Sequence, residues 1–317
     1  MNPEPETAPA LESVGWVSAR PRRAREVLER LWRFPLLLVQ YRDLVTTSLR
    51  RDLQARFQGT VLGWGWPLVQ PLFLFAVYYF IFTELLQFRM PDLPPAQRAG
   101  MGVYMFCGVV AWSALAEALT RGTNAIVENG NLIKKLAFPS ELLPLNVVLT
   151  SLVTMLFAVL VFLLAAFLTP IWPRPGLALL WLPLIVLLQA FFTYGLVLFF
   201  STLQVFLRDT LQVVGLATTV LMFVTPIFWV PEAMGPSVLR YLPLIRANPA
   251  YHLIRAWRGA LMGDVVLPAS EHIAGGHAVS VAAVPAHLAL FALWALAAYA
   301  LGYVFFVLSQ RRFADEV

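Results

Sequence analysis

Residues 142–207 read LLPLNVVLTSLVTMLFAVLVFLLAAFLTPIWPRPGLALLWLPLIVLLQAFFTYGLVLFFSTLQVFL, and Arg174 is the only charged residue among them. The sequence Trp-Pro-Arg-Pro at 172–175 is typical of a turn and divides the stretch into two apolar runs. About 20 apolar residues are enough to cross a bilayer as an α-helix. The stretch therefore predicts two transmembrane helices, at about 143–169 and 177–203.

Charged residues are scarce along the rest of the chain as well. Of the 317 residues, 59% are hydrophobic and 13% are charged, with a mean hydropathy of +0.72, whereas soluble proteins carry about 25% charged residues. Intervals of 18 or more residues without Asp, Glu, Lys or Arg lie at 57–83, 99–116, 142–173, 175–207, 210–231 and 272–310. They predict an all-α polytopic membrane protein with six transmembrane helices, at about 61–86, 100–119, 143–169, 177–203, 211–231 and 285–308. The pattern excludes a soluble enzyme, a disulfide-rich secreted domain, a disordered chain and a β-barrel, whose strands would alternate.

The distribution of Lys and Arg predicts the orientation, because these residues accumulate on the cytoplasmic side of a membrane. With a cytoplasmic N-terminus, 16 of the 23 Lys and Arg residues fall inside and 7 outside. We therefore expect both termini in the cytoplasm, with a tail at 1–34, a transmembrane domain at 35–312 and a short tail at 313–317. The apolar run at 35–40 is too short for the core of a signal peptide. The same bias explains the net charge of +5 without a nucleic-acid partner.

An amphipathic helix is predicted at 41–58, directly before the first span. Apolar residues recur at every fourth position and arginines occupy much of the remainder, namely Val45, Leu49, Leu53 and Phe57 beside Arg42, Arg50, Arg51 and Arg56. Such a helix can lie in the plane of the lipid headgroups. It is either a plain membrane anchor or, given its position, part of a gate.

The segment 121–141 is unusually apolar for a connector between spans. Its large apolar residues are Ile126, Val127, Leu132, Ile133, Leu136 and Phe138, and Glu128, Lys134 and Lys135 lie among them. This pattern favours a short helix that docks onto a cytoplasmic partner over a plain interfacial loop.

The predicted outer loop, 232–284, is too long for a turn and too apolar for a free linker. Helices are predicted at 236–245 and 249–262, and each is too short to cross a bilayer. Re-entrant or interfacial helices fit this loop, because irregular backbone at membrane depth must be surrounded by protein or by a wet cavity.

The energy source must come from outside this chain. No span contains Asp, Glu, Lys or Arg near its middle, which argues against a carrier driven by protons or sodium ions. Glu84, Glu117 and His287 lie at span ends and are expected at the membrane interfaces. The sequence also lacks the phosphate-binding motif G-x-x-x-x-G-K-[ST]. Any ATP is therefore hydrolysed on another polypeptide, and 121–141 is the candidate for contact with it.

No catalytic residues and no metal cluster are predicted. Cys107 is the only cysteine and is expected to be a packed helical residue, so no disulfide framework exists. His272 and His277 stand five apart, a spacing that fits no helical i, i+4 pair and gives a metal site weak support. We expect no cofactor on this chain.

Aromatic residues make up 13% of the chain and gather in the first, fourth and fifth predicted spans. Aromatic faces can stack on sugar rings, and tyrosine hydroxyls inside a span need polar partners. The candidates for an aromatic substrate pathway are Trp64, Trp66, Phe73, Tyr78, Tyr79, Phe223 and Trp229. Plain packing and interfacial aromatic belts are the alternative interpretation.

Three stretches carry a family resemblance: RFQGTVLGWGWPLVQP at 56–71, NLIKKLAFP at 131–139 and NPAYHLIRAWRGALM at 248–262. In this order and spacing they resemble ABC-2 type polysaccharide export permeases, at the start of span one, in the cytoplasmic loop and in the outer loop. The resemblance covers about residues 35–312. It is closer to the O-antigen and teichoic-acid branch than to the capsule branch.

This resemblance implies the transmembrane subunit of an ATP-driven exporter in the bacterial inner membrane. Two copies of the chain would join two copies of a separate P-loop ATPase, which binds ATP and magnesium. The cargo would be a polysaccharide linked to polyprenyl diphosphate, of the O-antigen type, moved from the cytoplasm to the periplasm.

The resemblance also implies roles for three segments. The segment 41–58 would be a gate helix whose arginines (Arg42, Arg50, Arg51 and Arg56) meet the diphosphate head group, with anchoring to anionic membrane lipids as the alternative. The segment 121–141 would be a coupling helix that uses Glu128, Leu132, Lys134, Lys135 and Phe138. A re-entrant pair at 232–270 would include Asn248, His252, Arg255 and Arg258.

Other interpretations stay open on the residues alone. The same fold suits an exporter of capsular polysaccharide, teichoic acid, a small lipid or a drug. An ion channel or a membrane scaffold, which needs no ATPase, is the alternative from another class. An embedded enzyme is disfavoured because the spans carry no charged catalytic pair.

Overall fold

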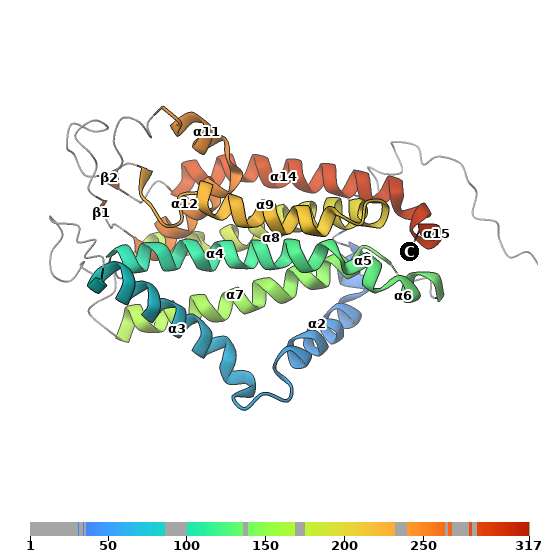
Figure 1. The fold of residues 1–317 in the computed structure, drawn as a ribbon, viewed down its shortest axis with the longest axis horizontal. Helices are drawn as coiled ribbons and strands as arrows, with labels where there is room; N and C mark the ends of the chain where they lie inside the picture. Colours follow the sequence, from blue (N-terminus) through green and yellow to red (C-terminus); the bar gives the residue numbers. More distant parts are fainter. Residues whose placement is uncertain are drawn as a thin grey trace, which may run out of the picture.

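The computed structural model describes residues 31, 34, 36–85, 100–135, 139–168, 175–231, 240–263, 266–267, 279–280 and 284–316. Within these residues the fold is helical apart from two short strands, β1 (Val266–Leu267) and β2 (Val279–Ser280), which pair antiparallel. Figure 1 shows the long helices running lengthwise through the molecule, with the β pair at one end of the bundle.

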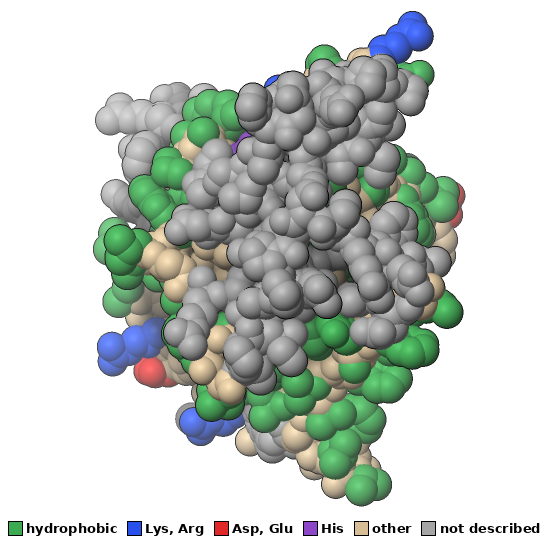
Figure 2. Space-filling model, turned by 90° about the vertical axis from the view of Figure 1, so that its left-hand side faces the viewer, with side chains coloured by type: hydrophobic (Ala, Val, Ile, Leu, Met, Phe, Trp, Pro, Cys, Tyr) green, Lys and Arg blue, Asp and Glu red, His purple; other side chains and the backbone are tan. Residues whose placement is uncertain are grey.

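Among the described residues, four helices are long and apolar enough to cross a membrane. They are α4 (Gly100–Thr123), α7 (Leu142–Leu168), α8 (Leu182–Phe206, extended at its start by the 3-10 turn Leu177–Trp181) and α14 (Val284–Ser309). They match the second, third, fourth and sixth predicted spans. The chain is thus a multi-pass helical membrane protein. Hydrophobic side chains dominate the described surface around the end of the bundle seen in Figure 2.

The other two predicted spans contain shorter α-helices than expected. α3 (Trp66–Tyr79) has 14 residues before a π-helical segment, Phe80–Leu85, and α9 (Thr210–Val224) has 15. At 1.5 Å per residue each α-helix is about 21–23 Å long, less than the ~30 Å hydrocarbon core. The α-helix in the first predicted span, at about 61–86, begins at Trp66, because a turn with Gly63 at φ +48° precedes it. α9 ends before Pro226, since the residue before a proline disfavours the helical conformation.

Among the described helices, α8 and α14 form the most extensive contact. A Cβ added at Gly302 would lie 1.9 Å from the carbonyl oxygen of Gly195, and a Cβ added at Gly195 would lie 2.4 Å from the backbone of Ala298. Small residues at such crossings let two helix backbones approach closely, which is how helices associate in membranes. These two glycines therefore set the α8–α14 packing.

The predicted outer-loop helix at 249–262 forms with the predicted bounds, as α12 (Pro249–Met262). It packs against α4, α8 and α14, and all its residues from Ala250 onward are buried. A short helix, α11 (Leu242–Ala247), precedes it; the helix predicted to begin at 236 begins at Leu242 among the described residues, and 232–239 lie outside them.

At the opposite end of the bundle, the connector after α4 forms two short helices rather than one, α5 (Ala125–Glu128) and α6 (Gly130–Lys135). A 3-10 turn, Gln310–Arg312, and the short α15 (Phe313–Glu316) end the described chain beside them.

The predicted amphipathic helix is α2 (Arg42–Phe57). Figure 1 shows α2 and α3 forming a V below the bundle, with the arms reaching towards opposite ends of α7. Leu53 is buried and Val45 half-buried on the side of α2 that meets α7. The apolar face predicted for the lipid headgroups therefore contacts protein at these positions.

Candidate functional site

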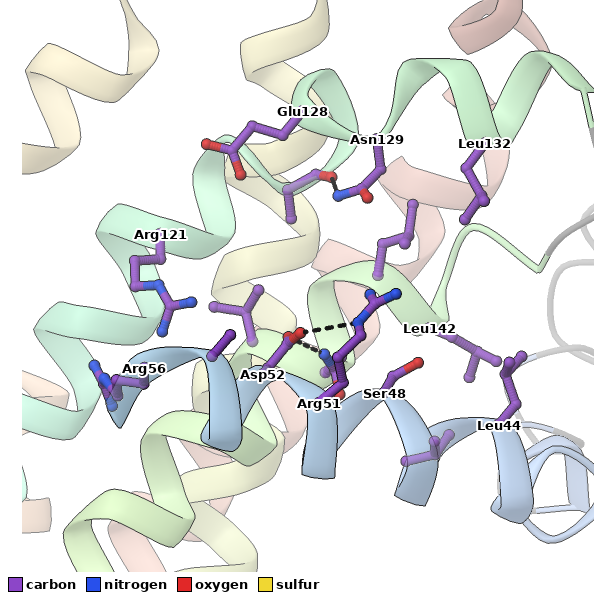
Figure 3. Close-up of a pocket in the computed structure, with 16 residues that line it drawn as sticks. Leu44, Ser48, Arg51, Asp52, Arg56, Arg121, Glu128, Asn129, Leu132 and Leu142 are labelled. Carbon is purple, nitrogen blue, oxygen red and sulfur yellow. Dashed lines mark hydrogen bonds and ion pairs between the residues drawn. The ribbon is translucent and has the colours of Figure 1, made fainter. Parts of the chain in front are cut away.

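A groove of about 710 Å³ lies between α2, the end of α4, the α5–α6 segment and the start of α7. Figure 3 shows α2 as one wall and the α5–α6 segment as the other. The groove brings together two segments that the sequence singled out separately, the predicted gate helix at 41–58 and the predicted coupling segment at 121–141. Its lining residues are Leu44, Val45, Ser48, Arg51, Asp52, Ala55, Arg56, Arg121, Ala125, Glu128, Asn129, Leu132, Leu142, Leu143, Asn146 and Val147.

The end of α2 is tied to the bundle by Arg56. Its guanidinium forms an ion pair with Glu117 of α4 and donates a hydrogen bond to Thr154 of α7 at 2.8 Å. The same Glu117 oxygen accepts a hydrogen bond from Arg121 at 3.2 Å, one helical turn further along α4. Glu117, which the sequence placed simply at an interface, therefore holds two arginines from different helices.

A second polar tie lies one turn earlier on α2. Asp52 accepts a hydrogen bond from the side-chain amide of Asn146 on α7, and the Arg51 guanidinium lies 3.8 Å from the Asp52 carboxylate. Figure 3 shows both contacts meeting at Asp52 in the middle of the groove. The charges on the inner side of α2 are thus paired within the chain.

The four predicted head-group arginines fall into two groups. Arg51 and Arg56 line the groove, whereas Arg42 and Arg50 do not. Arg42 lies 3.7 Å from its neighbour Asp43. Only the first group is placed to meet a ligand in the groove.

The predicted coupling residues also divide. Glu128 and Leu132 line the groove, and Glu128 accepts a hydrogen bond from Asn124 at 2.8 Å. Lys134 is exposed, while the side chain of Lys135 and residues 136–138, including Phe138, lie outside the described part of the chain. Ile126 is fully buried where α5 packs against α7 and α8, so this apolar residue serves the protein's own core.

Arg258 of the predicted outer-loop set has an internal role. It is fully buried, and its three nitrogens donate to the backbone carbonyls of Tyr104 (3.0 Å), Pro226 (2.7 Å) and Ile227 (2.8 Å). A Cβ at Gly108 would lie 2.8 Å from the guanidinium, so α4 leaves room for it only at a glycine. A buried charge is tolerated when its donors are satisfied in this way.

Asn248 fixes the start of α12. Its side-chain oxygen accepts from the backbone N–H of Ala250 at 2.9 Å, as a helix N-cap does, and its amide donates to the hydroxyl of Thr225 at 2.8 Å. Arg255, also predicted, lies over the ring of Tyr251 at 5.8 Å.

His252 forms a pair with His287 across α12 and α14. The Nδ1 atoms are 3.0 Å apart, and Nε2 of His252 is 2.7 Å from the carbonyl oxygen of Arg246. Because a carbonyl oxygen only accepts, the neutral His252 ring carries its proton on Nε2 and donates it to Arg246. Its Nδ1 is then an acceptor, and the Nδ1–H of His287 donates to it. Burial lowers the pKa of His252, which favours this neutral form.

The aromatic residues predicted to line a substrate pathway do not form one cluster within a single chain. Tyr78 contacts Phe228 with ring centres 6.0 Å apart, and Tyr79 contacts Phe75 at 6.0 Å. Trp66 is 40%, Phe73 70% and Phe223 62% exposed, while the indole N–H of Trp229 donates to the carbonyl of Phe223. The side chain of Trp64 is not described. Among the described aromatics of this set, none lines the groove.

A buried chain of hydrogen bonds links three helices that sequence reasoning did not connect. The indole of Trp257 on α12 donates to Gln189 of α8 at 2.8 Å, and Gln189 donates to the carbonyl of Ala111 on α4 at 3.1 Å. Gln189 is a lone amide in a charge-free span, and such isolated polar residues in spans are the signal that could have found it.

The described residues contain no group of three or more His, Cys, Asp or Glu that could hold a metal ion. His272 and His277 lie outside that part of the chain. Cys107 is fully buried in α4, as predicted.

A multi-pass helical protein with a polar groove at one end of its bundle has the form of a membrane transport subunit. The family model described as ABC-2 type transporter matches residues 43–262, and the chain belongs to this family. It is similar to the O-antigen export system permease protein RfbA of Klebsiella pneumoniae, with 30% identity over 225 residues, which cover 71% of this chain and 82% of the relative. The protein of the same name from Myxococcus xanthus is 28% identical over 244 residues, covering 77% of this chain and 89% of the relative.

The match confirms the family resemblance drawn from the three sequence stretches. Its span, 43–262, begins within α2 and ends with α12, so it includes every element that lines the groove. Members of this family are the membrane subunits of transporters, and the family implies pairing with an ABC ATPase subunit.

Proposed function

We propose that this chain is the transmembrane subunit of an ATP-driven exporter that moves a lipid-linked polysaccharide of the O-antigen type from the cytoplasm to the periplasm. The observation that carries the proposal is the similarity, over most of both chains, to proteins named O-antigen export system permeases. The polar groove beside the predicted coupling loop gives the proposal a physical site.

ATP hydrolysis takes place on a separate subunit that carries nucleotide and magnesium. This part of the proposal is supported by the absence of a phosphate-binding motif from the sequence, and by α5 and α6, which present Lys134 and the 39% exposed Val127 at one end of the bundle. A movement of the ATPase transmitted through these helices reaches the groove directly, because Glu128 and Leu132 line it.

The working unit is a homodimer with two ATPase subunits. The predicted pathway residues Phe73 and Phe223 lie on the outer surface of one chain, so a channel that they line needs a second copy beside it. Each copy crosses the bacterial inner membrane six times with both termini in the cytoplasm, the short helices α3 and α9 acting as the remaining spans. α11 and α12 form the re-entrant pair on the outer side.

The cargo carries a polyprenyl diphosphate whose head group approaches α2 at Arg51 and Arg56. Arginine suits this role because its guanidinium can donate two parallel hydrogen bonds to phosphate oxygens. Tyr78 and Tyr79 then meet the sugar chain, stacking on its apolar faces.

Deletion of the gene in its native host tests the proposal. We expect O-antigen type polysaccharide to disappear from the cell surface and its lipid-linked precursor to accumulate in the inner membrane, with both effects reversed by the intact gene. Unchanged surface polysaccharide in the deletion strain would contradict the proposal.

A further inference from the structure

Arg56 lines two cavities. It lines the groove of about 710 Å³, and it also lines a smaller cavity of about 180 Å³ between α3, α4 and α7. The smaller cavity has the polar side chains of Gln70, Ser113, Glu117, Ser151 and Thr154 on its walls. Arg56 therefore lies where the groove next to α2 meets the smaller cavity, and its partner Glu117 lines the smaller cavity.

Arg56 can be reached from the groove, because it is one of the residues that line it. The side chains of Arg56 and Glu117 are 28% and 24% exposed, so the pair is neither fully solvated nor sealed off. Every arginine on the groove wall already has a carboxylate partner within the chain, Arg51 at Asp52 and both Arg56 and Arg121 at Glu117. Arg51 is 78% exposed, whereas the Arg56 side chain is only 28% exposed and held by Glu117, so an anion that binds Arg56 must compete with that carboxylate.

Glu117 can release Arg56 and still keep a cationic partner. If Arg56 leaves it, Glu117 keeps its contact with Arg121, 3.2 Å away on the same helix. Breaking a partly buried ion pair is usually unfavourable because it leaves one charge unpaired. Here the exchange leaves no unpaired charge, since Glu117 stays paired with Arg121. Arg56 in turn gains a phosphate group, whose oxygens can accept two parallel hydrogen bonds where Glu117 accepts through a single oxygen.

We propose that Glu117 is a releasable latch: an anion of the phosphate class entering the groove takes Arg56 from Glu117, and α2 then separates from α4. The ligand class is a phosphate or diphosphate monoester or diester, and Glu117 acts as a positioning residue that reserves Arg56 until the anion arrives. The inference rests on the proposed function only for the source of the anion, the diphosphate of a lipid-linked cargo.

The test measures the distance across the groove in the full-length chain. Cys107→Ala removes the only native cysteine, and Thr47→Cys on α2 with Asn131→Cys on α6 provide two exposed positions for spin labels. Labelled chains are mixed with unlabelled excess, so that only pairs within one chain are counted, and placed in phosphatidylcholine nanodiscs. Inorganic pyrophosphate is the probe, with ionic strength held constant by sodium chloride.

We expect pyrophosphate to shift the label distance to longer values in the otherwise native chain. Glu117→Gln should show the longer distance in part without ligand and bind pyrophosphate about tenfold more tightly, because the competing charged hydrogen bond is gone. Arg56→Gln should abolish the response to pyrophosphate. Arg50→Gln is the matched control, since Arg50 is an exposed arginine on the same helix outside the groove, and it should respond like the native chain.

The proposal is overturned if pyrophosphate leaves the distance unchanged, if Glu117→Gln weakens pyrophosphate binding, or if Arg50→Gln loses as much response as Arg56→Gln. Nanodiscs containing phosphatidylglycerol and no pyrophosphate identify the source: a long distance there supports the exchange but assigns the trigger to membrane lipid. The gene deletion separates the two ideas. If pyrophosphate does not change the label distance but the deletion strain loses its surface polysaccharide, only the latch proposal is wrong. If pyrophosphate lengthens the distance but the deletion strain keeps its surface polysaccharide, only the export function is wrong.

Discussion

The guanidinium carbon of Arg258 on α12 lies 3.3 Å from the centre of the Tyr104 ring on α4, and the same side chain donates to the Tyr104 carbonyl. Two further donations, to Pro226 and Ile227, join the segment after α9 to the same point. One buried side chain thus fastens three segments that lie far apart in the sequence.

Replacement of Arg258 should therefore loosen the packing of α12 against α4 and the segment after α9. Arg258→Leu leaves three backbone carbonyls without this donor, and we expect a loss of stability on the order of 3 kcal/mol. Arg258→Lys should also destabilise, because an ammonium group cannot reproduce the planar arrangement of donors. The measurement is denaturant unfolding in detergent, followed by tryptophan fluorescence. Arg246→Gln, at an exposed position of α11, is the control and should leave stability unchanged; equal effects would contradict the assigned role.

The α8–α14 crossing predicts opposite results for two Gly→Ala substitutions. Gly302→Ala places a Cβ 1.9 Å from a backbone oxygen, so the helices must move apart, at a cost of about 3 kcal/mol or more. Gly215→Ala in α9 meets nothing within 4 Å, and we expect a neutral or slightly stabilising effect of up to about 1 kcal/mol. Unfolding midpoints of the two variants give the comparison, and a tolerated Gly302→Ala would refute the close crossing.

The proposed aromatic pathway makes a prediction about export rather than stability. Tyr78→Leu with Tyr79→Leu should lower polysaccharide export at least tenfold with little change in the amount of folded protein, because the stacking surfaces are lost. The corresponding Tyr→Phe changes separate stacking from hydrogen bonding by the hydroxyl. Phe167→Leu, at a 62% exposed position of α7 outside the predicted pathway, is the control. Full export by the double leucine variant would leave packing as the role of these residues.

The His252–His287 pair predicts a loss of stability in acid. Burial lowers the pKa of His252 below its usual value of ~6.5, so the unfolded chain takes up a proton before the folded chain does. The contribution of the neutral His252 to the free energy of unfolding is therefore complete above about pH 6.5 and decreases as the pH falls below that value. His252→Asn should reduce this pH dependence, measured as unfolding free energy between pH 7.5 and 5. An unchanged slope in the variant would show that other groups cause it.

The long helices could be predicted from the sequence alone, but the groove could not. The charge-free runs that predict α7 and α8 depend only on local composition, and both helices formed close to the expected bounds. The lengths of α3 and α9 depend on single residues such as Gly63 and Pro226, which a window of average hydropathy does not resolve.

The groove depends on pairs that are distant in the chain, Arg56 with Glu117 and Asp52 with Asn146, separated by 61 and 94 residues. No spacing rule brings such residues together. The sequence identified Arg56 as a candidate because it belongs to an arginine-rich helix, and its partner only as a carboxylate near a span end. The role of Ile126 was misjudged for a related reason, because an apolar residue in a connector can serve the protein's own core as well as a partner.

The central claim is that this membrane subunit transports its cargo only with the power of a separate ATPase. Proteoliposomes containing the purified chain, with and without the co-expressed nucleotide-binding subunit, test it most directly, by the ATP-dependent movement of a lipid-linked polysaccharide across the bilayer. We predict movement only when both subunits and magnesium–ATP are present. Uphill movement by this chain alone would contradict the account.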